Sequence, residues 1–390
     1  MKSKSARIPL DTLQCFMRDV FIGLGVPKAD AAICADVLAA ADRLGFDSHG
    51  ISRLKPIYYD RIRQGIQHPR TRLRKIADAG ATAVLDGGNG MGHVVAKKAM
   101  ALAIRKAKTH GLGMVAVRNS THYGIAGYYP LMAVRAGMIG ITGTNARPSM
   151  APTFGTQNML GTNPLTFGMP TDEPFPFLLD CATSTIQRGK VEVHSKLDKP
   201  LSSGWVIGPD GSARTDPHQV LEDLLRGQAA LLPLGGAGEE WSGYKGYGYA
   251  TAVEILCAAL QQGAFLHMLS GRDRNGNPAP CPIGHFFLAI DIRHFTPLIA
   301  FKKTAGEILR QLRASRKMPG AKRIYTAGEK EYLTECERLR NGVPVNRETR
   351  LEMIAMRDAL GLKAYRFAFE KPGPSRRRDS AQAGGKSKLV

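Results

Sequence analysis

Apolar residues recur at helical spacing near the start of the chain and form short runs through its middle. From residue 30 to 44 the apolar positions follow a helical period, and Gly45 is placed to end that helix. A second helix is predicted from His49 to about Gln64, with Ser48 as its N-cap. Buried strands are predicted over 82–86, 113–117, 138–142, 165–169, 177–179 and 285–292, and helices over 94–109, 125–136, 249–261, 304–314, 330–340 and 348–360.

This order of elements indicates a mixed α/β fold with helical ends. The sequence predicts a helical domain over residues 1–75 that is completed by residues 300–368, and an α/β domain over 76–299. Residues 369–390 are rich in Pro, Ser and Gly and carry a basic run, so they are predicted to form a disordered tail.

The composition is that of a globular protein with a sizeable core. The chain has 390 residues, of which 43% are hydrophobic and 22% charged. No window of 18 residues stays apolar and no secretory cleavage pattern follows the N-terminus, so we expect a cytoplasmic protein without a membrane span. The six cysteines contain no C-x-x-C pair, which favours reduced thiols over a zinc site, another metal site or a disulfide framework.

A net charge of +21 raises the question of nucleic-acid binding. Part of this charge lies in the tail, which holds the run Arg376 to Arg378. The body of the chain has no Asp or Glu between Gly87 and Thr171 but has basic residues scattered through that stretch. Such a stretch attracts anions, and a phosphate-bearing cofactor or a carboxylate substrate would use it as readily as DNA.

A glycine-rich segment lies between a predicted strand and a predicted helix, at residues 85–93. Its glycines follow a G-x-G-x-G pattern, but His93 stands where the third glycine of a dinucleotide-binding fingerprint belongs. The acidic residue expected about 20 positions later would fall in the acid-free stretch. The segment is therefore interpreted as a glycine turn without a ligand, and any dinucleotide must be bound by another kind of fold.

Two polar clusters are candidates for chemistry. At the start of the second predicted helix, His49 and Arg53 are four residues apart and would share one face. There Arg53 would hold the carboxylate of a 2-hydroxy or 2-oxo acid while the imidazole exchanges a proton with the neighbouring oxygen. The second cluster, residues 119–127, follows a buried strand and precedes a helix, where α/β folds place ligands. The alternative for the first cluster is a helix N-cap with a solvated face. The alternative for the second is a polar turn with a surface histidine.

Several ordered segments resemble the malate/L-lactate dehydrogenase family, a non-Rossmann group that includes sulfolactate, ureidoglycolate and cyclic-imine-reducing enzymes. The resemblance extends over about residues 8–368. Its segments are DSHGISRL (47–54), NSTHYGIAGYY (119–129), LGTNP (160–164), DCATSTIQRGK (180–190), GWVIGPDGSARTDP (204–217), SGYKGYGYA (242–250), GHFFLAIDI (284–292) and AGE (327–329).

The resemblance implies a dependence on NAD or NADP, a fold unlike the Rossmann domain, and a homodimer with the cofactor near the subunit contact. It makes His49 the acid/base, Ser48 its relay partner, and Arg53 and Thr162 the contacts of the substrate. His122 is a second candidate for the proton role, since some members have this histidine described as the proton acceptor. The implied cofactor contacts are His122, Tyr123, Gly124, Ile125, Ala126, Asp180, Cys181, Ala182, Arg188, Gly189, Tyr244 and Lys245, with residues 324–330 added less specifically.

The predicted reaction is hydride transfer between the hydroxyl-bearing carbon of a small 2-hydroxy acid and nicotinamide, with His49 taking the hydroxyl proton. Ureidoglycolate oxidation and cyclic-imine reduction are alternatives within the family. Lys190 stands where the imine-reducing branch has an acidic residue, which favours hydroxy acids. A basic nucleic-acid-binding protein and a cofactor-binding protein without turnover are the alternatives of other classes.

Overall fold

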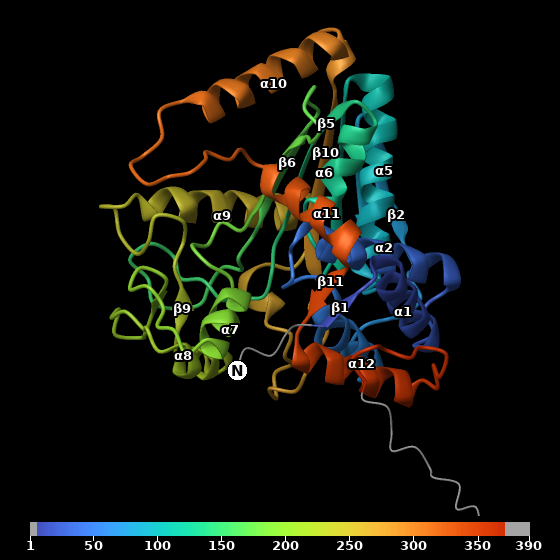
Figure 1. Cartoon of the computed structure of the whole chain (residues 1–390), viewed down its shortest axis with the longest axis vertical. Coiled ribbons are helices and arrows are strands. Elements are labelled where there is room, and N and C mark those ends of the chain that lie inside the picture. The colour runs from blue at the N-terminus through green and yellow to red at the C-terminus, as the bar shows by residue number, and fades with distance from the viewer. Residues whose placement is uncertain (1–5, 371–390) are drawn as a thin grey trace, which may run out of the picture.

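The fold is built on a mixed sheet of seven strands, seen in a computed structural model that describes residues 6–370 (Figure 1). In spatial order the strands are β2 (Arg74–Ala79), β3 (Thr82–Asp86), β4 (Leu112–Ser120), β10 (Ile283–Asp291), β5 (Met138–Thr144), β6 (Leu165–Met169) and β7 (Phe177–Cys181). β3 and β4 are parallel, whereas the other adjacent pairs are antiparallel. The predicted mixed α/β fold with a central mixed sheet is confirmed.

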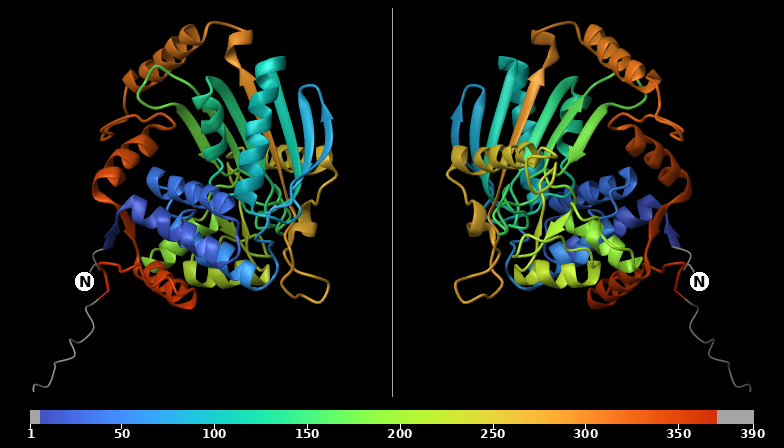
Figure 2. Two further views of the ribbon diagram at one scale, coloured as in Figure 1. Left: turned by 90° about the vertical axis from the view of Figure 1, so that its right-hand side faces the viewer. Right: turned by 90° about the vertical axis from the view of Figure 1, so that its left-hand side faces the viewer.

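Helices cover both faces of this sheet (Figure 2). On one face α5 (Gly92–His110) and α6 (Tyr128–Arg135) pack on the central strands, and on the other face α9 (Gly243–Ala258) crosses them. Successive side chains of a strand point to opposite faces. Accordingly Phe287 of β10 belongs to the apolar cluster beneath α5 and α6, while Phe286 packs against the residues of α9.

The two ends of the chain share a second hydrophobic cluster. It joins α1 (Leu10–Gly23) and α2 (Lys28–Leu44) to α12 (Arg347–Ala359), which comes from the far end of the sequence. β1 (Ala6–Ile8) also pairs with β11 (Val343–Val345). The two chain ends therefore pack together, and the division of the chain into domains stays a prediction.

The position of α10 (Leu298–Ala314) differs from the prediction that residues 300–368 complete the helical domain. It lies beyond the end of the sheet, away from α1 and α12 (Figure 1). Arg310 on this helix forms ion pairs with Asp172 and Glu173, which follow β6. Only α11 (Glu329–Asn341) and the residues after it return to the N-terminal helices. α10 therefore belongs with the sheet, because its contacts are with the loop that follows β6.

A third cluster of apolar residues underlies the segment between β7 and α9. This segment contains α7 (Arg188–Lys196), β8 (Val206–Ile207), α8 (Pro217–Arg226) and β9 (Ala230–Leu231). None of these elements was predicted from the sequence, because each is short and its apolar side chains pack against the others of the group. The sequence analysis also missed α1 and the exposed edge strand β2.

The glycine segment between β3 and α5 packs against neighbouring backbone. A Cβ on Gly92 would collide with the carbonyl oxygens of Thr121 and His122, and a Cβ on Gly90 would lie 2.8 Å from Thr71 Cα. These glycines are required because chain segments approach closely, which supports the interpretation of a turn without a ligand.

Two predictions concern the ends of the chain and a membrane. The predicted basic tail falls almost entirely on residues 371–390, which lie outside the described residues. Within residues 6–370, no helix has the length and apolar character needed to cross a bilayer.

Candidate active site

The helix predicted after Ser48 is present but begins two residues later than predicted, and its middle is a π-helix. The helical backbone begins at Ile51 with α3 (Ile51–Arg53), continues as a π-helix (Leu54–Tyr59) and ends in α4 (Asp60–Arg63). His49 therefore precedes the helix, and the prediction that His49 and Arg53 share one helical face is wrong. Ser48 is not the N-cap, because the carboxylate of Asp42 accepts a hydrogen bond of 2.9 Å from the Ile51 N–H.

The buried carboxylate of Asp42 holds the turn that precedes α3. A Cβ at position 50 would collide with its carboxylate, so only glycine lets the turn close over it. Burial raises the pKa of Asp42 to about 8, since the charged form has left water. The local sequence thus places His49 at the end of a tight turn held by a buried acid.

The structure brings His49 and His122 together, although they are 73 positions apart in the chain. Their rings are nearly parallel, with centroids 5.7 Å apart. Ser48 Oγ lies 2.8 Å from His49 Nδ1, and Tyr58 Oη lies 2.6 Å from His122 Nδ1. Each histidine is therefore held at Nδ1 by a hydroxyl group, and no hydrogen bond within residues 6–370 engages either Nε2.

The contacts of His122 define which of its nitrogens carries the proton. The Gly124 N–H donates to Nδ1 at 3.3 Å, so this nitrogen is an acceptor. The Tyr58 hydroxyl then also donates to Nδ1, and the neutral ring carries its proton on Nε2. Tyr58 lies in the π-helix, an element that occurs often at functional sites.

Both histidines are disposed to remain neutral. Removal from water, and to a lesser extent the nearby charge of Arg53, lowers the pKa of His49 to about 4. The pKa of His122 is also well below its ordinary value, first because of burial and then because of His49. A neutral imidazole can accept a proton from a hydroxyl group at its bare nitrogen, or donate a hydrogen bond to an oxyanion from its N–H group.

The two histidines line a cavity of about 210 Å³. Residues of three strand ends form the other walls, together with the turn before α3 and the segment before α7. The lining residues are Phe46, Ser48, His49, His122, Tyr123, Gly124, Ile125, Ala126, Thr144, Asn145, Ala146, Thr162, Pro164, Asp180, Gln187 and Ile283. A cavity of this size with hydroxyl, amide and imidazole groups suits a small polar molecule.

Arg53 lies next to this cavity but lines a different one. Its guanidinium donates to the Ser48 carbonyl oxygen, and its Nη2 is 3.6 Å from Glu192 Oε2. The second cavity, of about 340 Å³, also contains Gly189. Ser48 borders both cavities, so Arg53 and His49 are neighbours that open into separate spaces. The structure therefore does not show the predicted convergence of the two side chains.

Comparisons with known proteins identify the family. The family model described as malate/L-lactate dehydrogenase matches residues 8–353. The chain belongs to the malate/L-lactate dehydrogenase family. It is an oxidoreductase that acts on a CH–OH group, as are the relatives named malate and sulfolactate dehydrogenases.

Among its relatives, the malate dehydrogenase of Pyrococcus horikoshii is 43% identical over 357 residues, which cover 92% of this chain and 96% of that protein. The L-sulfolactate dehydrogenase of Methanocaldococcus jannaschii is 38% identical, over 88% of this chain and 94% of that protein. Among solved structures, malate dehydrogenase from Entamoeba histolytica is 42% identical with a TM-score of 0.90, covering 94% of this chain and all of that one.

Within this family fold, the predicted cofactor residues divide into three groups. His122 to Ala126 and Asp180 line the histidine cavity. Asp180 accepts a hydrogen bond of 2.7 Å from the Gly127 N–H, and burial raises its pKa to about 6. Gly189 packs against Ser48 and Arg53 in the second cavity. Cys181, Ala182, Arg188, Tyr244 and Lys245 line neither cavity, and Arg188 pairs with Glu192.

Some residues of the site were missed by the sequence analysis. Tyr58 had no recognisable signal, because its position depends on the π-helix. A signal was available for Thr144 and Asn145. They lie at the end of a predicted strand, where α/β folds place ligands. Phe46 and Gln187 enter the cavity from loops, where spacing carries little information.

Proposed function

We propose that this dehydrogenase interconverts a small 2-hydroxy acid of the malate, lactate or sulfolactate type and its 2-oxo acid, with NAD or NADP as the hydride carrier. The observation that carries the proposal is the pair of neutral, nearly parallel histidines on the wall of one polar cavity. Alcohol oxidation requires a base at the hydroxyl group and a donor that stabilises the oxygen. The two rings supply one group of each kind.

We assign the base to His49 and the donor to His122. When His49 donates from Nδ1 to Ser48 Oγ, its Nε2 has a free lone pair that takes the substrate hydroxyl proton. His122, whose Nδ1 accepts from Tyr58 and Gly124, presents Nε2–H to the same oxygen. In the reduction of the 2-oxo acid, protonated His49 returns the proton to the oxygen.

The residues of the cavity fit a nicotinamide ring. Its carboxamide needs both donors and acceptors, which the backbone N–H and C=O groups of residues 124–126 offer. When bound, the dinucleotide supplies the hydride acceptor or donor. A cavity of about 210 Å³ is too small for a whole dinucleotide, so the part of that molecule beyond the nicotinamide ring would lie outside it. We propose that Arg188, Gly189, Tyr244 and Lys245 contact that outer part, with residues 180–182 nearer the ring.

We propose Arg53 and Thr162 as the groups that hold the carboxylate of the substrate. Thr162 already lines the cavity. Arg53 would have to exchange its bond to the Ser48 carbonyl oxygen for the substrate, a short movement because Ser48 borders both cavities. The guanidinium is suited to this role because it offers two parallel donors to a carboxylate.

We also propose a homodimer that works in the cytoplasm. The support for a dimer is apolar surface on α10 and just before it, where Phe295 and Ile299 are 72% and 81% exposed. The support for a reducing compartment is that all six cysteines are free thiols. Sedimentation at micromolar concentration, where a monomer would contradict the proposal, tests the dimer.

The deciding experiment is a spectrophotometric assay at the absorbance band of the reduced nicotinamide. Malate, lactate, sulfolactate and ureidoglycolate are each supplied with NAD and with NADP, and a cyclic imine acid is supplied with the reduced forms. We expect turnover of at least one 2-hydroxy acid. Preferential reduction of the imine would favour the alternative within the family, and binding of the dinucleotide without any turnover would show a scaffold that has lost its activity.

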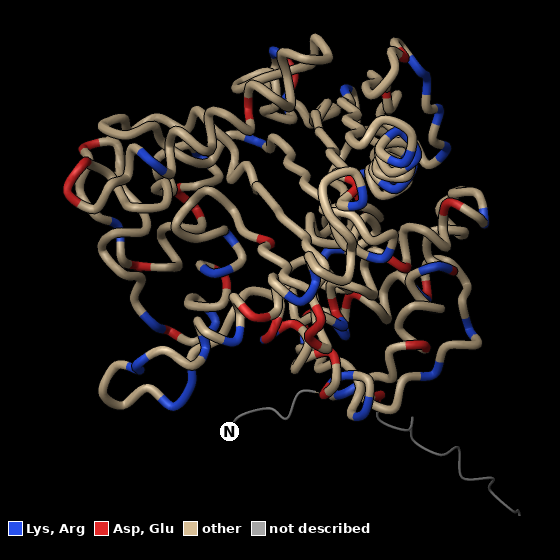
Figure 3. The backbone as a smooth tube through the Cα atoms, turned by 90° about the horizontal axis from the view of Figure 1, so that it is seen from above, with Lys and Arg blue, Asp and Glu red and all other residues tan. Residues whose placement is uncertain are grey.

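Nucleic-acid binding is the alternative of another class. Basic residues are interspersed with acidic ones along most of the described backbone (Figure 3). We expect weak association that disappears when residues 371–390 are removed. A gel-shift affinity that survives this truncation and falls steeply with salt would support the alternative.

A further inference from the structure

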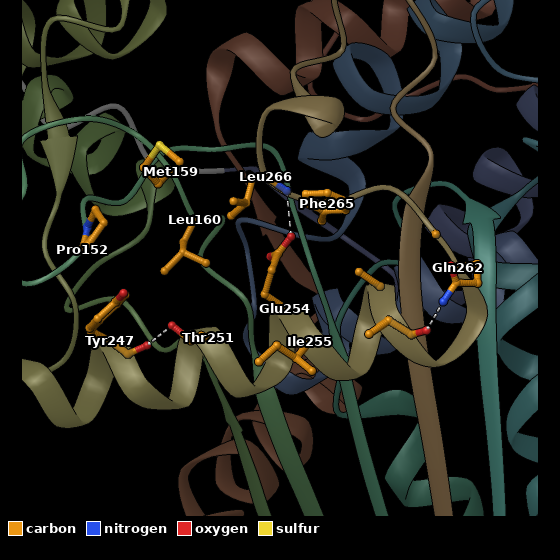
Figure 4. Close-up of a pocket in the computed structure, with 13 residues that line it drawn as sticks. Pro152, Met159, Leu160, Tyr247, Thr251, Glu254, Ile255, Gln262, Phe265 and Leu266 are labelled. Atoms are coloured by element: carbon orange, nitrogen blue, oxygen red, sulfur yellow. Dashed lines mark hydrogen bonds between the residues drawn. The ribbon is translucent and has the colours of Figure 1, made fainter.

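We propose that Glu254 is a positioning residue that holds two walls of the histidine cavity from α9. This inference rests on the proposed function, since the walls in question contain Thr162. Glu254 lies on α9 and is only 5% exposed. It also lines an apolar groove along α9, which Figure 4 shows with Tyr247 and Thr251 on the left and Glu254 near the centre.

The carboxylate of Glu254 is hydrogen-bonded at both oxygens. Oε2 accepts from Asn163 Nδ2 at 2.8 Å. Oε1 accepts from the Leu266 N–H at 2.9 Å, the bond drawn in Figure 4, and more weakly from Asn145 Nδ2 at 3.4 Å. No cation within residues 6–370 pairs with this carboxylate. Its stability in the ionised form therefore depends on these three N–H donors.

The two asparagines are the residues that connect Glu254 to the site. Asn145 lines the histidine cavity, and Asn163 lies between Thr162 and Pro164, which also line it. Both asparagines are fully buried. Asn163 adopts a left-handed backbone with φ 31°, which surrounding contacts must maintain. One carboxylate thus fixes the segment after β5 and the segment before β6.

The turn that contains Asn163 also has hydrogen bonds to residues other than Glu254. Thr183 Oγ1 donates to the carbonyl oxygens of Thr162 and Asn163, so it holds the backbone of the turn. Asn163 Nδ2 also donates to the Ala250 carbonyl oxygen, and its Oδ1 is buried without a partner. Glu254 and the Ala250 carbonyl oxygen therefore hold the Asn163 amide in one orientation, and through it the position of the neighbouring Thr162, with Glu254 the shorter and charged contact.

Glutamine is a poor replacement at this position, although it has the same shape. Its amide nitrogen would face an N–H donor, either from Asn163 or from Leu266 and Asn145. At least one of the present hydrogen bonds would then be lost. Because Thr162 is proposed to contact the substrate acid, the expected effect falls on the binding of the acid rather than on that of the dinucleotide.

The experiment compares E254Q and E254A with T251V, which lies one helical turn earlier and lines the same groove. We expect E254Q to raise KM for the 2-hydroxy acid about tenfold, the scale of one charged hydrogen bond, with KM for the dinucleotide within a factor of two. We expect T251V to match the wild type in both. Should E254A fail to fold, T183V gives an independent variant on the same turn, and we expect it to change KM for the acid in the same direction by a smaller factor.

The outcomes separate this inference from the proposed function. An active wild type with an unchanged KM for the acid in E254Q would overturn the positioning role alone. An equal change in both KM values, accompanied by a lower melting temperature, would show a purely structural role and would also overturn it. A wild type that oxidises no 2-hydroxy acid would overturn both proposals.

Discussion

Two hydrogen-bonded histidine groups in this protein contain similar residue types in different surroundings. His49 and His122 are half-buried, are held by Ser48 and Tyr58, and face one cavity. On the surface of the α7–α8 region, Ser195 Oγ lies 3.0 Å from His218 Nδ1 and His218 Nε2 lies 3.0 Å from an Asp198 oxygen.

The surface group has the residue types of a Ser-His-Asp triad, but the side chains of His218 and Asp198 are 60% and 87% exposed. None of its members lines the three cavities described above. Water competes for each of its hydrogen bonds and screens its charges. The comparison shows that hydrogen-bonded residues become candidates for catalysis only where a cavity gives a reactant access and limits water.

The largest expected effect tests this difference directly. H49A should lower kcat roughly 10²- to 10⁴-fold, since a positioned base is lost from the reacting oxygen. The matched control, H218A, should leave kcat and KM within a factor of two. Steady-state kinetics with the preferred hydroxy acid gives both numbers. If H49A turns over like the wild type, the proton role passes to His122.

A smaller effect on activity is expected from a change at Arg53, which lies beside Ser48 between the two cavities. R53K should raise KM for the hydroxy acid roughly ten- to a hundredfold, because an ammonium group cannot form two parallel bonds to a carboxylate. The measurement is KM for the acid and for its amide. A wild type that binds the acid and the amide equally well would contradict the assignment of Arg53.

A third prediction concerns the hydroxyl group that orients His122. Tyr58 is fully buried, so Y58F keeps the ring packing and removes only the bond to Nδ1. We expect kcat to fall roughly fivefold, the scale of one neutral hydrogen bond, with the melting temperature nearly unchanged. Nitrogen chemical shifts of His122 should also show a larger share of the Nδ1–H form. An unchanged tautomer would argue against this role of Tyr58.

The smallest effect concerns pH. His49 has a pKa of about 4, so it stays neutral well below the ordinary histidine range. We expect kcat/KM for oxidation to change less than about twofold between pH 5.5 and 7.5, where an ordinary histidine would titrate. A fall in kcat/KM centred near pH 6.5 would contradict a neutral His49 in the free enzyme.

The same lowered pKa has a consequence for stability, with a defined sign. Below about pH 6.5 His49 binds a proton in the unfolded chain but not in the folded chain, so the contribution of His49 to the free energy of unfolding decreases as the pH falls toward 4. This contribution is fully retained above pH 6.5. Urea unfolding at each pH therefore serves as the control that separates loss of activity from loss of folded protein.

The sequence alone determined the elements whose signal is local. β3 and β6 have the predicted bounds, because a short apolar run between turn residues defines a buried strand. The ordered segments around His49, His122 and Thr162 indicated the family, which the comparisons confirm. The wrong prediction for His49 and Arg53 has a local cause as well. The periodicity after Ser48 does not indicate that Asp42 caps the turn or that a π-helix follows it.

The tertiary structure decided which of these residues meet. His49 and His122 share a cavity because the turn after α2 lies against the end of β4, whereas Arg53, only four residues from His49, opens into another space. Glu254 contacts Asn163 from α9, which lies on the face of the sheet opposite to α5 and α6. Local spacing fixes the direction of a side chain relative to its own element, and only packing between elements fixes what lies in that direction.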